Sequence, residues 1–94
     1  MNAVAKRLVI RGRVQGVGYR DAVVQAAFDK GVAGWVRNRH DGSVEIFVQG
    51  VPESIEGFIE WCRQGPPLAR VVAVDVSPAE IDAGLTRFAL RPSG

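Results

Sequence analysis

The sequence predicts an α+β fold in which two helices cover one face of a mainly antiparallel sheet. Segments in which apolar and polar residues alternate, as in a strand, flank two segments in which apolar residues recur every three or four positions, as in a helix. Glycine and proline residues mark many of the junctions between these segments. The resulting order is strand, helix, strand, strand, helix, strand and a short last strand, which is typical of a two-layer sandwich.

Alternation predicts five strands, which are residues 6–14, 34–40, 43–49, 70–76 and 85–91. In the first strand, Leu8 and Ile10 would lie on one face, opposite the arginines. Asp41-Gly42 signals a hairpin turn between the second and third strands. We expect Phe88 and Leu90 of the last strand to face the core.

Two segments have the periodicity of helices that pack on a sheet. The apolar face of the first helix, residues 20–30, comprises Val23, Val24, Ala27 and Phe28. The apolar face of the second helix, which begins at Pro52 and ends at Gly65-Pro66-Pro67, comprises Ile55, Phe58, Ile59 and Cys62. Because strands separate the two helices, both must pack on the same face of the sheet. The order of elements, βαββαβ plus a short C-terminal strand, indicates a sandwich of the ferredoxin-like type.

Length and composition indicate a single domain over residues 1–94, with one core. Hydrophobic residues make up 47% of the chain and charged residues 23%, which is typical of a soluble globular protein. No apolar run approaches the roughly 20 residues of a membrane span, and Leu8-Val9-Ile10 is too short for a secretory signal. The single cysteine, Cys62, agrees with a reducing compartment, and we interpret it as a buried thiol rather than a nucleophile. We therefore expect a cytoplasmic protein with no membrane partner.

The net charge of +2, from 12 basic and 10 acidic residues, is too small to indicate nucleic-acid binding by itself. The distribution of the charge is more informative, because several arginines gather in the first half of the chain. These are Arg7, Arg11, Arg13, Arg20, Arg37 and Arg39. They predict a positive potential that favours anionic ligands. For Arg37 and Arg39 two interpretations stay open, since they either steer anions or form a solvated strand face.

A glycine-rich segment joins the first strand to the first helix. Gly16 and Gly18 can adopt positive φ values, which lets successive main-chain N–H groups point into one concave nest. The helix start adds unpaired N–H groups and the positive end of its dipole, and Arg20 can hold two oxygens of the same anion. The spacing excludes a Walker loop and a dinucleotide fingerprint. Spacing alone also allows a tight turn in which Arg20 is a solvated cap.

Three longer motifs carry more information than this loop alone. They are Gly12-Arg-Val-Gln-Gly-Val-Gly-Tyr-Arg20, then Gly34-Trp-Val-Arg-Asn38 with Gly42, Val44 and Gly50 after it, and Gly65-Pro-Pro-Leu-Ala-Arg-Val71. In order and spacing, the first two resemble the two signature segments of the acylphosphatase family, and the third resembles the family's usual segment after the second helix. The resemblance spans nearly the whole chain.

The resemblance implies an acylphosphatase, an enzyme that hydrolyses the carboxyl–phosphate anhydride bond of small acyl phosphates to a carboxylate and inorganic phosphate. It implies a monomer with no metal or other cofactor. Arg20 matches the family's substrate-binding arginine, and Asn38 matches the asparagine that orients the attacking water. With Val14 at its start, the phosphate loop would contain Gln15, Gly16, Val17, Gly18, Tyr19 and Arg20 as phosphate-binding residues. Inorganic phosphate or sulfate is expected to bind there as well.

Several residues near these motifs have a plainer interpretation. His40 lies two residues after Asn38, but we interpret it as a solvated turn residue, so that an oxygen of the substrate phosphate takes the proton of the water. Tyr19 and Trp35 are expected to pack, and Asp21 is expected to point into solvent rather than into the loop. One histidine and one cysteine are too few for a usual zinc site.

Two rival functions are compatible with a fold of this type. The first is a nucleic-acid-binding module, which would stack bases on sheet aromatics such as Trp35 and Phe47, although the usual RNP signature is absent. The second is a domain that handles carbamoyl phosphate, as in the N-terminal part of large hydrogenase-maturation carbamoyltransferases. We expect neither a nucleic-acid partner nor the second role, because that role usually comes with further domains.

Overall fold

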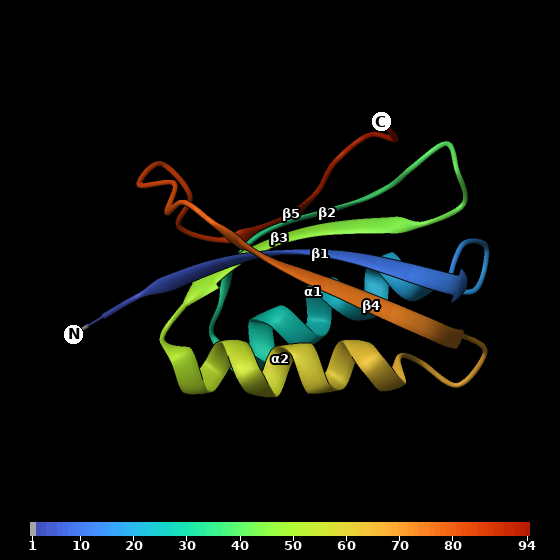
Figure 1. The fold of residues 1–94 in the computed structure, drawn as a ribbon, viewed down its shortest axis with the longest axis horizontal. Helices are drawn as coiled ribbons and strands as arrows, with labels where there is room; N and C mark the ends of the chain where they lie inside the picture. Colours follow the sequence, from blue (N-terminus) through green and yellow to red (C-terminus); the bar gives the residue numbers. More distant parts are fainter. Residues whose placement is uncertain (1) are drawn as a thin grey trace.

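The computed structural model describes residues 2–94, and its elements follow the predicted order (Figure 1). The strands are β1 (Val4–Arg13), β2 (Ala33–Asn38), β3 (Val44–Gly50), β4 (Arg70–Ala79) and β5 (Phe88–Leu90). The helices are α1 (Tyr19–Lys30) and α2 (Pro52–Gln64). Neither helix is long and apolar enough to cross a lipid bilayer within this described part of the chain.

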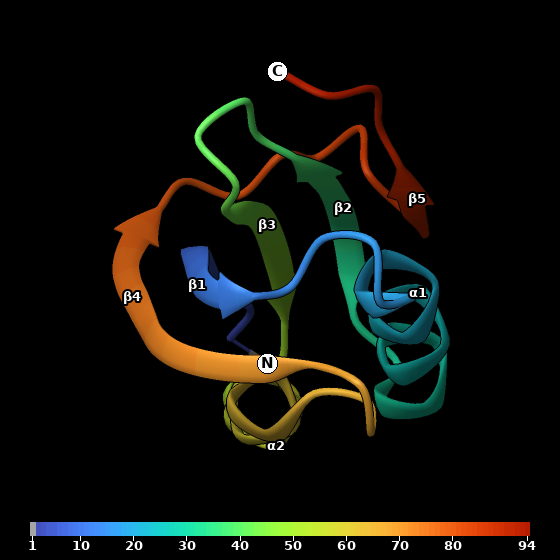
Figure 2. The ribbon, with the colours of Figure 1, turned by 90° about the vertical axis from the view of Figure 1, so that its right-hand side faces the viewer.

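The strands form one sheet in the order β4-β1-β3-β2-β5. Neighbouring strands are antiparallel except β2 and β5, which pair in parallel at the edge of the sheet. Figure 2 shows α1 and α2 side by side on one face of this sheet. The predicted ferredoxin-like sandwich is therefore confirmed, with a mixed sheet in which β2 and β5 form a parallel pair at one edge.

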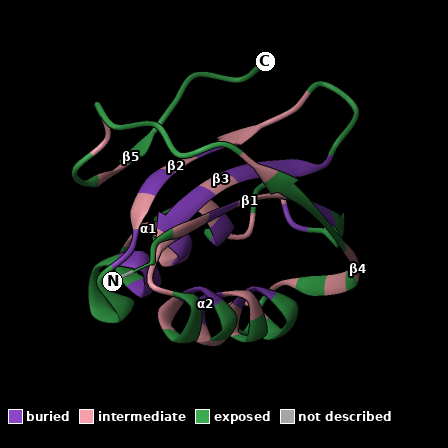
Figure 3. Ribbon diagram, turned by 60° about the vertical axis from the view of Figure 1, so that its left-hand side comes forward, coloured by how far each residue is buried: buried purple, intermediate pink, exposed green. Residues whose placement is uncertain are grey.

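The core lies between the two helices and the sheet face that they cover (Figure 3). Leu8 and Ile10 of β1 are fully buried there, as the alternation of that strand predicts. Burial of a side chain of this size stabilises the fold by about 1.5–3 kcal/mol. Other residues that fill the core are Val23, Ala27, Val36, Val44, Ile46, Val48, Ile55, Phe58 and Cys62.

The buried face of α1 differs from the predicted one. Phe28 was expected in the core but is 80% exposed, whereas Tyr19 and Ala26 are buried beside Val23 and Ala27. The helix begins at Tyr19, one residue earlier than predicted, and this large ring determines which side of the helix faces the sheet. At about 100° per residue, Phe28 lies on the opposite side of the helix from Tyr19.

The last strand is shorter than predicted and buries only one of its two expected core residues. Phe88 packs against Phe58 with ring centroids 5.8 Å apart, as expected. Leu90 is 49% exposed, so the prediction that it faces the core is wrong. Because β5 is an edge strand of three residues, Leu90 has a neighbouring strand on one side only.

Two other strands end two or more residues away from the predicted positions. β4 continues to Ala79, three residues beyond the expected end, and passes through Pro78. Proline is tolerated there because β4 is the other edge of the sheet, so the missing N–H removes no bond to a further strand. β2 ends at Asn38 rather than His40, since residues 39–42 already form the turn of the hairpin.

Candidate active site

The glycine-rich loop leads from the end of β1 into the first turn of α1. Gly16 and Gly18 have φ values of 73° and 78°, in the left-handed region that favours glycine. A Cβ atom at either position would meet nothing within 4 Å. The backbone conformation, rather than crowding, is therefore what requires glycine here, as the sequence predicts.

The main-chain N–H groups of this loop are unpaired. The first N–H that closes the α1 helix is that of Ala22, which donates to the Gly18 carbonyl over 3.1 Å. Among the described residues, no backbone carbonyl accepts a hydrogen bond from the N–H groups of residues 15–21. Since α1 begins at Tyr19, these donors lie at the positive end of its dipole, which favours an anion.

A cavity of about 210 Å³ lies against this loop. It is lined by Val14, Gly16, Gly18, Tyr19, Arg20, Asp21 and Asn38. The cavity therefore brings together Arg20 and Asn38, which are 18 positions apart in the sequence. It is smaller than the roughly 300–1,000 Å³ typical of sites for drug-sized ligands, and so suits a small group such as a phosphate.

Asn38 is the last residue of β2, and its side chain has an unpaired oxygen. The Oδ1 atom is buried and accepts no hydrogen bond from the described residues. A buried oxygen without a partner costs about 1–3 kcal/mol, so native proteins keep few of them. Asn38 lines the same cavity as Arg20, and a bound water or ligand that reached Oδ1 would supply the missing hydrogen bond.

Arg20 in the first turn of α1 is half-buried on the cavity wall. In residues 2–94 its guanidinium forms no ion pair, so its charge is not neutralised by a neighbouring carboxylate. Asp21 is exposed and also lines the cavity. The exposure of Asp21 agrees with the prediction, whereas its place on the cavity wall was not expected.

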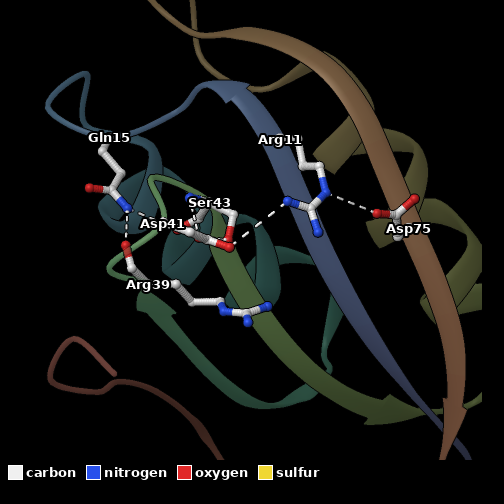
Figure 4. A network of polar contacts seen from close by, with 6 residues as sticks. All are labelled: Arg11, Gln15, Arg39, Asp41, Ser43 and Asp75. Carbon is white, nitrogen blue, oxygen red and sulfur yellow. Dashed lines mark hydrogen bonds and ion pairs between the residues drawn. The ribbon is translucent and has the colours of Figure 1, made fainter.

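Not every residue of the predicted phosphate loop lines the cavity. Gly16, Gly18, Tyr19 and Arg20 do, whereas Gln15 and Val17 do not. Val17 packs against the core. The amide nitrogen Nε2 of Gln15 donates instead to the carbonyls of Arg39 and Ser43, over 2.8 and 2.9 Å (Figure 4). Only the main-chain N–H groups of Gln15 and Val17 are left for an anion.

Tyr19 and Cys62 are buried together beneath the loop. The Tyr19 hydroxyl donates to the Cys62 carbonyl over 2.8 Å. Burial raises the pKa of Tyr19 far above its ordinary value, and burial also raises the pKa of Cys62 to about 12. The tyrosine therefore packs, as predicted, and the thiol is neither ionised nor accessible as a nucleophile near neutral pH.

The arginines of the first half of the chain divide into two groups. Arg7 and Arg37 donate from Nε to the buried Glu45 carboxylate over 2.6 and 2.7 Å, on the sheet face away from the helices. Burial alone would raise the pKa of Glu45, but these bonds lower it overall. Arg11 pairs with Asp75 and lies 3.9 Å from Asp41.

Arg13, Arg20 and Arg39 form no ion pair within residues 2–94. The predicted positive potential is thus concentrated on fewer residues than the sequence indicates, with Arg20 on the cavity itself. Arg37 belongs to a salt-bridged cluster on the opposite sheet face rather than to this cavity.

Two further residues line the cavity besides those predicted to bind phosphate or water. Val14 is the first residue of the predicted loop, and Asp21, which was expected to point into solvent, follows Arg20 directly. His40 is exposed in the turn and does not line the cavity, in agreement with its predicted role as a turn residue. A larger depression of about 560 Å³ lies by the end of α1 and β5, away from all of these residues.

Comparisons with known proteins identify the family of this chain. The family model for acylphosphatase matches residues 6–90, which is most of the chain. The chain belongs to the acylphosphatase family. An acylphosphatase from Thermococcus kodakarensis is 53% identical over 88 residues, which cover 94% of this chain and 96% of that relative.

Solved structures extend the likeness to the fold. The crystal structure of the acylphosphatase from Bacillus subtilis matches with a TM-score of 0.89 at 36% identity, over 94% of this chain and 98% of the other. Full-length HypF, in its phosphate- and nucleotide-bound form, matches with a TM-score of 0.90 at 29% identity. That match covers 98% of this chain but 12% of HypF, so the acylphosphatase fold also occurs as part of a larger protein.

Proposed function

We propose that this chain hydrolyses the carboxyl–phosphate anhydride bond of small acyl phosphates and releases a carboxylate and inorganic phosphate. One observation carries the proposal: Asn38, whose Oδ1 has no hydrogen-bond partner, and Arg20, whose guanidinium forms no ion pair within residues 2–94, line the same small cavity. Membership of the acylphosphatase family supports the reaction class.

The phosphoryl group would lie against the loop between β1 and α1. The N–H groups of residues 15–21, the helix dipole and Arg20 supply donors and positive charge on one side of the cavity. Phosphoryl transfer depends mainly on positioning and on stabilisation of the charge of the equatorial oxygens, and fixed donors of this kind provide both. Inorganic phosphate and sulfate carry the same oxygens and would bind as competitors.

Asn38 would hold the attacking water. Its Oδ1 accepts a hydrogen bond from the water, while the amide nitrogen of the same side chain can donate one, so the water is oriented without being deprotonated. The leaving group is a carboxylate with a pKa near 4, which needs no general acid. The proton of the water passes to an oxygen of the transferring phosphoryl group, in agreement with the exposed position of His40 away from the cavity.

The nucleic-acid rival receives little support from the open face of the sheet. Trp35 stacks on Phe47 with ring centroids 6.3 Å apart. The guanidinium groups of Arg37 and Arg91 already lie over the Trp35 ring, at 5.4 and 4.9 Å from its centroid. A base would have to displace these contacts before it stacked on the ring.

The proposal is tested by hydrolysis of benzoyl phosphate with and without EDTA, with carbamoyl phosphate as a second substrate in the same assay. We expect hydrolysis of benzoyl phosphate at the same rate in both conditions, and competitive inhibition by inorganic phosphate. Absence of benzoyl phosphate hydrolysis would overturn the proposal. Faster turnover of carbamoyl phosphate would favour the carbamoyl phosphate alternative. That the protein is a cytoplasmic monomer without a metal stays a prediction.

A further inference from the structure

The side chain of Gln15 connects the phosphate loop to the hairpin that carries Asn38. Its Nε2 atom donates to the Arg39 carbonyl over 2.8 Å and to the Ser43 carbonyl over 2.9 Å (Figure 4). Asn38 and Val44 form the last residue pair between β2 and β3, so the two acceptors are the next residues along the hairpin. Gln15 therefore forms hydrogen bonds to the hairpin, the first of them at Arg39, the residue directly after Asn38.

The two acceptors belong to a part of the hairpin that is already held in place. The Ser43 carbonyl also accepts from the Arg39 N–H over 2.9 Å, and the Arg39 carbonyl from the Gly42 N–H over 3.2 Å. Asp41 Oδ1 accepts from the N–H and the hydroxyl of the buried Ser43, over 2.9 and 2.5 Å. The hydrogen bonds from Gln15 thus end on a turn that is already held in place by its own hydrogen bonds.

The loop and the hairpin, which the Gln15 side chain joins, carry different parts of the site. Gly16, the residue after Gln15, and Arg20 line the cavity from the loop and α1, whereas Asn38 lines it from β2. In the proposed reaction the loop side holds the phosphoryl group and Asn38 holds the water. Since an in-line attack depends on the separation of these two groups, a shift of the loop against the hairpin would affect the chemical step.

We propose that Gln15 is a positioning residue that sets the separation between the phosphate-binding loop and the water held by Asn38. This inference rests on the proposed hydrolytic function and assigns the Gln15 side chain a role apart from phosphate binding. Both amide hydrogens of Nε2 are used on the hairpin carbonyls, so this nitrogen has none left for a phosphate oxygen.

The test compares Gln15→Met with wild type for benzoyl phosphate turnover and for phosphate affinity, measured by competition. Methionine keeps the length of the side chain but donates no hydrogen bond. Because the phosphate donors all lie on the loop side, we expect kcat to fall roughly 10- to 100-fold while phosphate affinity changes less than about 3-fold. Gln25→Met, at an exposed glutamine of α1 outside the cavity, is the matched control and should behave as wild type.

A second variant, Gln15→Glu, keeps the shape of the side chain but places a carboxyl oxygen, in place of the amide nitrogen, against the two carbonyl oxygens. Its carboxylate repels both acceptors, whereas its protonated form can donate to one of them. Its activity relative to wild type should therefore rise as the pH falls toward the ordinary glutamate pKa of about 4.3. Loss of the hydrogen bonds without a titratable group, as in Gln15→Met, would not produce this pH dependence.

The outcomes separate this inference from the proposed function. If wild type does not hydrolyse benzoyl phosphate, the proposed function fails and the role of Gln15 fails with it. If wild type is active but Gln15→Met retains the wild-type kcat, only the role of Gln15 is overturned. An equal loss of kcat and of phosphate affinity also overturns it, because the side chain would then shape the phosphate loop itself.

Discussion

The hydroxyl of Tyr19 donates a 2.8 Å hydrogen bond to the main-chain carbonyl of Cys62. Four residues after Cys62, where a helical N–H would ordinarily meet this carbonyl, the chain has Pro66, which has no N–H. The tyrosine hydroxyl takes the place of that missing donor. The end of α2 is thereby joined to the first residue of α1, directly after Gly18 of the phosphate loop.

Replacement of Tyr19 by phenylalanine should lower the free energy of unfolding without a comparable effect on catalysis. The change leaves the buried Cys62 carbonyl without its donor, which costs about 1–3 kcal/mol. Urea denaturation measures this loss. We expect kcat to change less than about 3-fold, because the ring itself still fills its place. An unchanged denaturation midpoint would contradict this role of the hydroxyl.

Replacement of Arg20 by alanine should remove most of the activity. The variant loses the charged donor that Arg20 places on the cavity wall, and loss of a single such donor costs on the order of 100- to 1,000-fold in rate. Benzoyl phosphate kinetics and phosphate competition should show a lower kcat/KM together with weaker phosphate binding. Arg13→Ala is the control, since Arg13 is exposed and does not line the cavity. Wild-type kcat/KM in Arg20→Ala would refute the assignment.

Replacement of Asn38 by alanine should lower kcat without a matching loss in the free energy of unfolding. We expect kcat to fall about 100-fold with phosphate affinity nearly unchanged, because the water is placed for the chemical step only. The same change deletes a buried oxygen that has no partner, so the free energy of unfolding should not fall as it does for an ordinary buried truncation. Thermal denaturation beside the kinetics checks both parts, and a strong loss of phosphate affinity would argue against the proposed role.

The pair of arginines around Glu45 predicts a loss of stability in acid. Because hydrogen bonds from Arg37 and Arg7 hold the folded-state pKa of Glu45 below its ordinary value, this contribution is present above that ordinary value. It is lost as the pH falls through the lower, folded-state pKa. Urea midpoints of wild type and Glu45→Gln should therefore differ clearly at pH 7 and converge in the acid range. A difference that stays constant with pH would contradict the prediction.

The architecture was predictable because its signals are local. The alternation of β1, the Asp41-Gly42 turn and the stripe of α2 each lie within a few residues, and the structure contains all three. The position of Phe28 was not predictable in this way, since the buried face of α1 depends on Tyr19, which contacts Cys62 of α2, 43 positions away in the sequence.

The candidate site was predicted through its motifs, and the cavity brings Arg20 and Asn38 together as those motifs imply. The direction of the Gln15 side chain was not accessible from the same motifs. Its acceptors are main-chain carbonyls 24 and 28 positions away, and a carbonyl is the same whichever residue carries it. A contact of this kind has no pattern in the sequence, so only the folded chain reveals it.

The proposed phosphate loop would bind its anion mainly through main-chain N–H groups, and this has a consequence for mutagenesis. Changing a side chain to alanine leaves the peptide nitrogens of residues 15–21 in place, so an ordinary scan of this loop would register Arg20 and the left-handed glycines but not the donors themselves. Deleting one donor requires an ester in place of a peptide bond, and a chain of 94 residues is within reach of ligation of synthetic segments. Such ester substitutions in the loop would measure the contribution of each main-chain N–H group to phosphate binding separately. A side-chain substitution such as alanine cannot do this, because it leaves the backbone N–H in place.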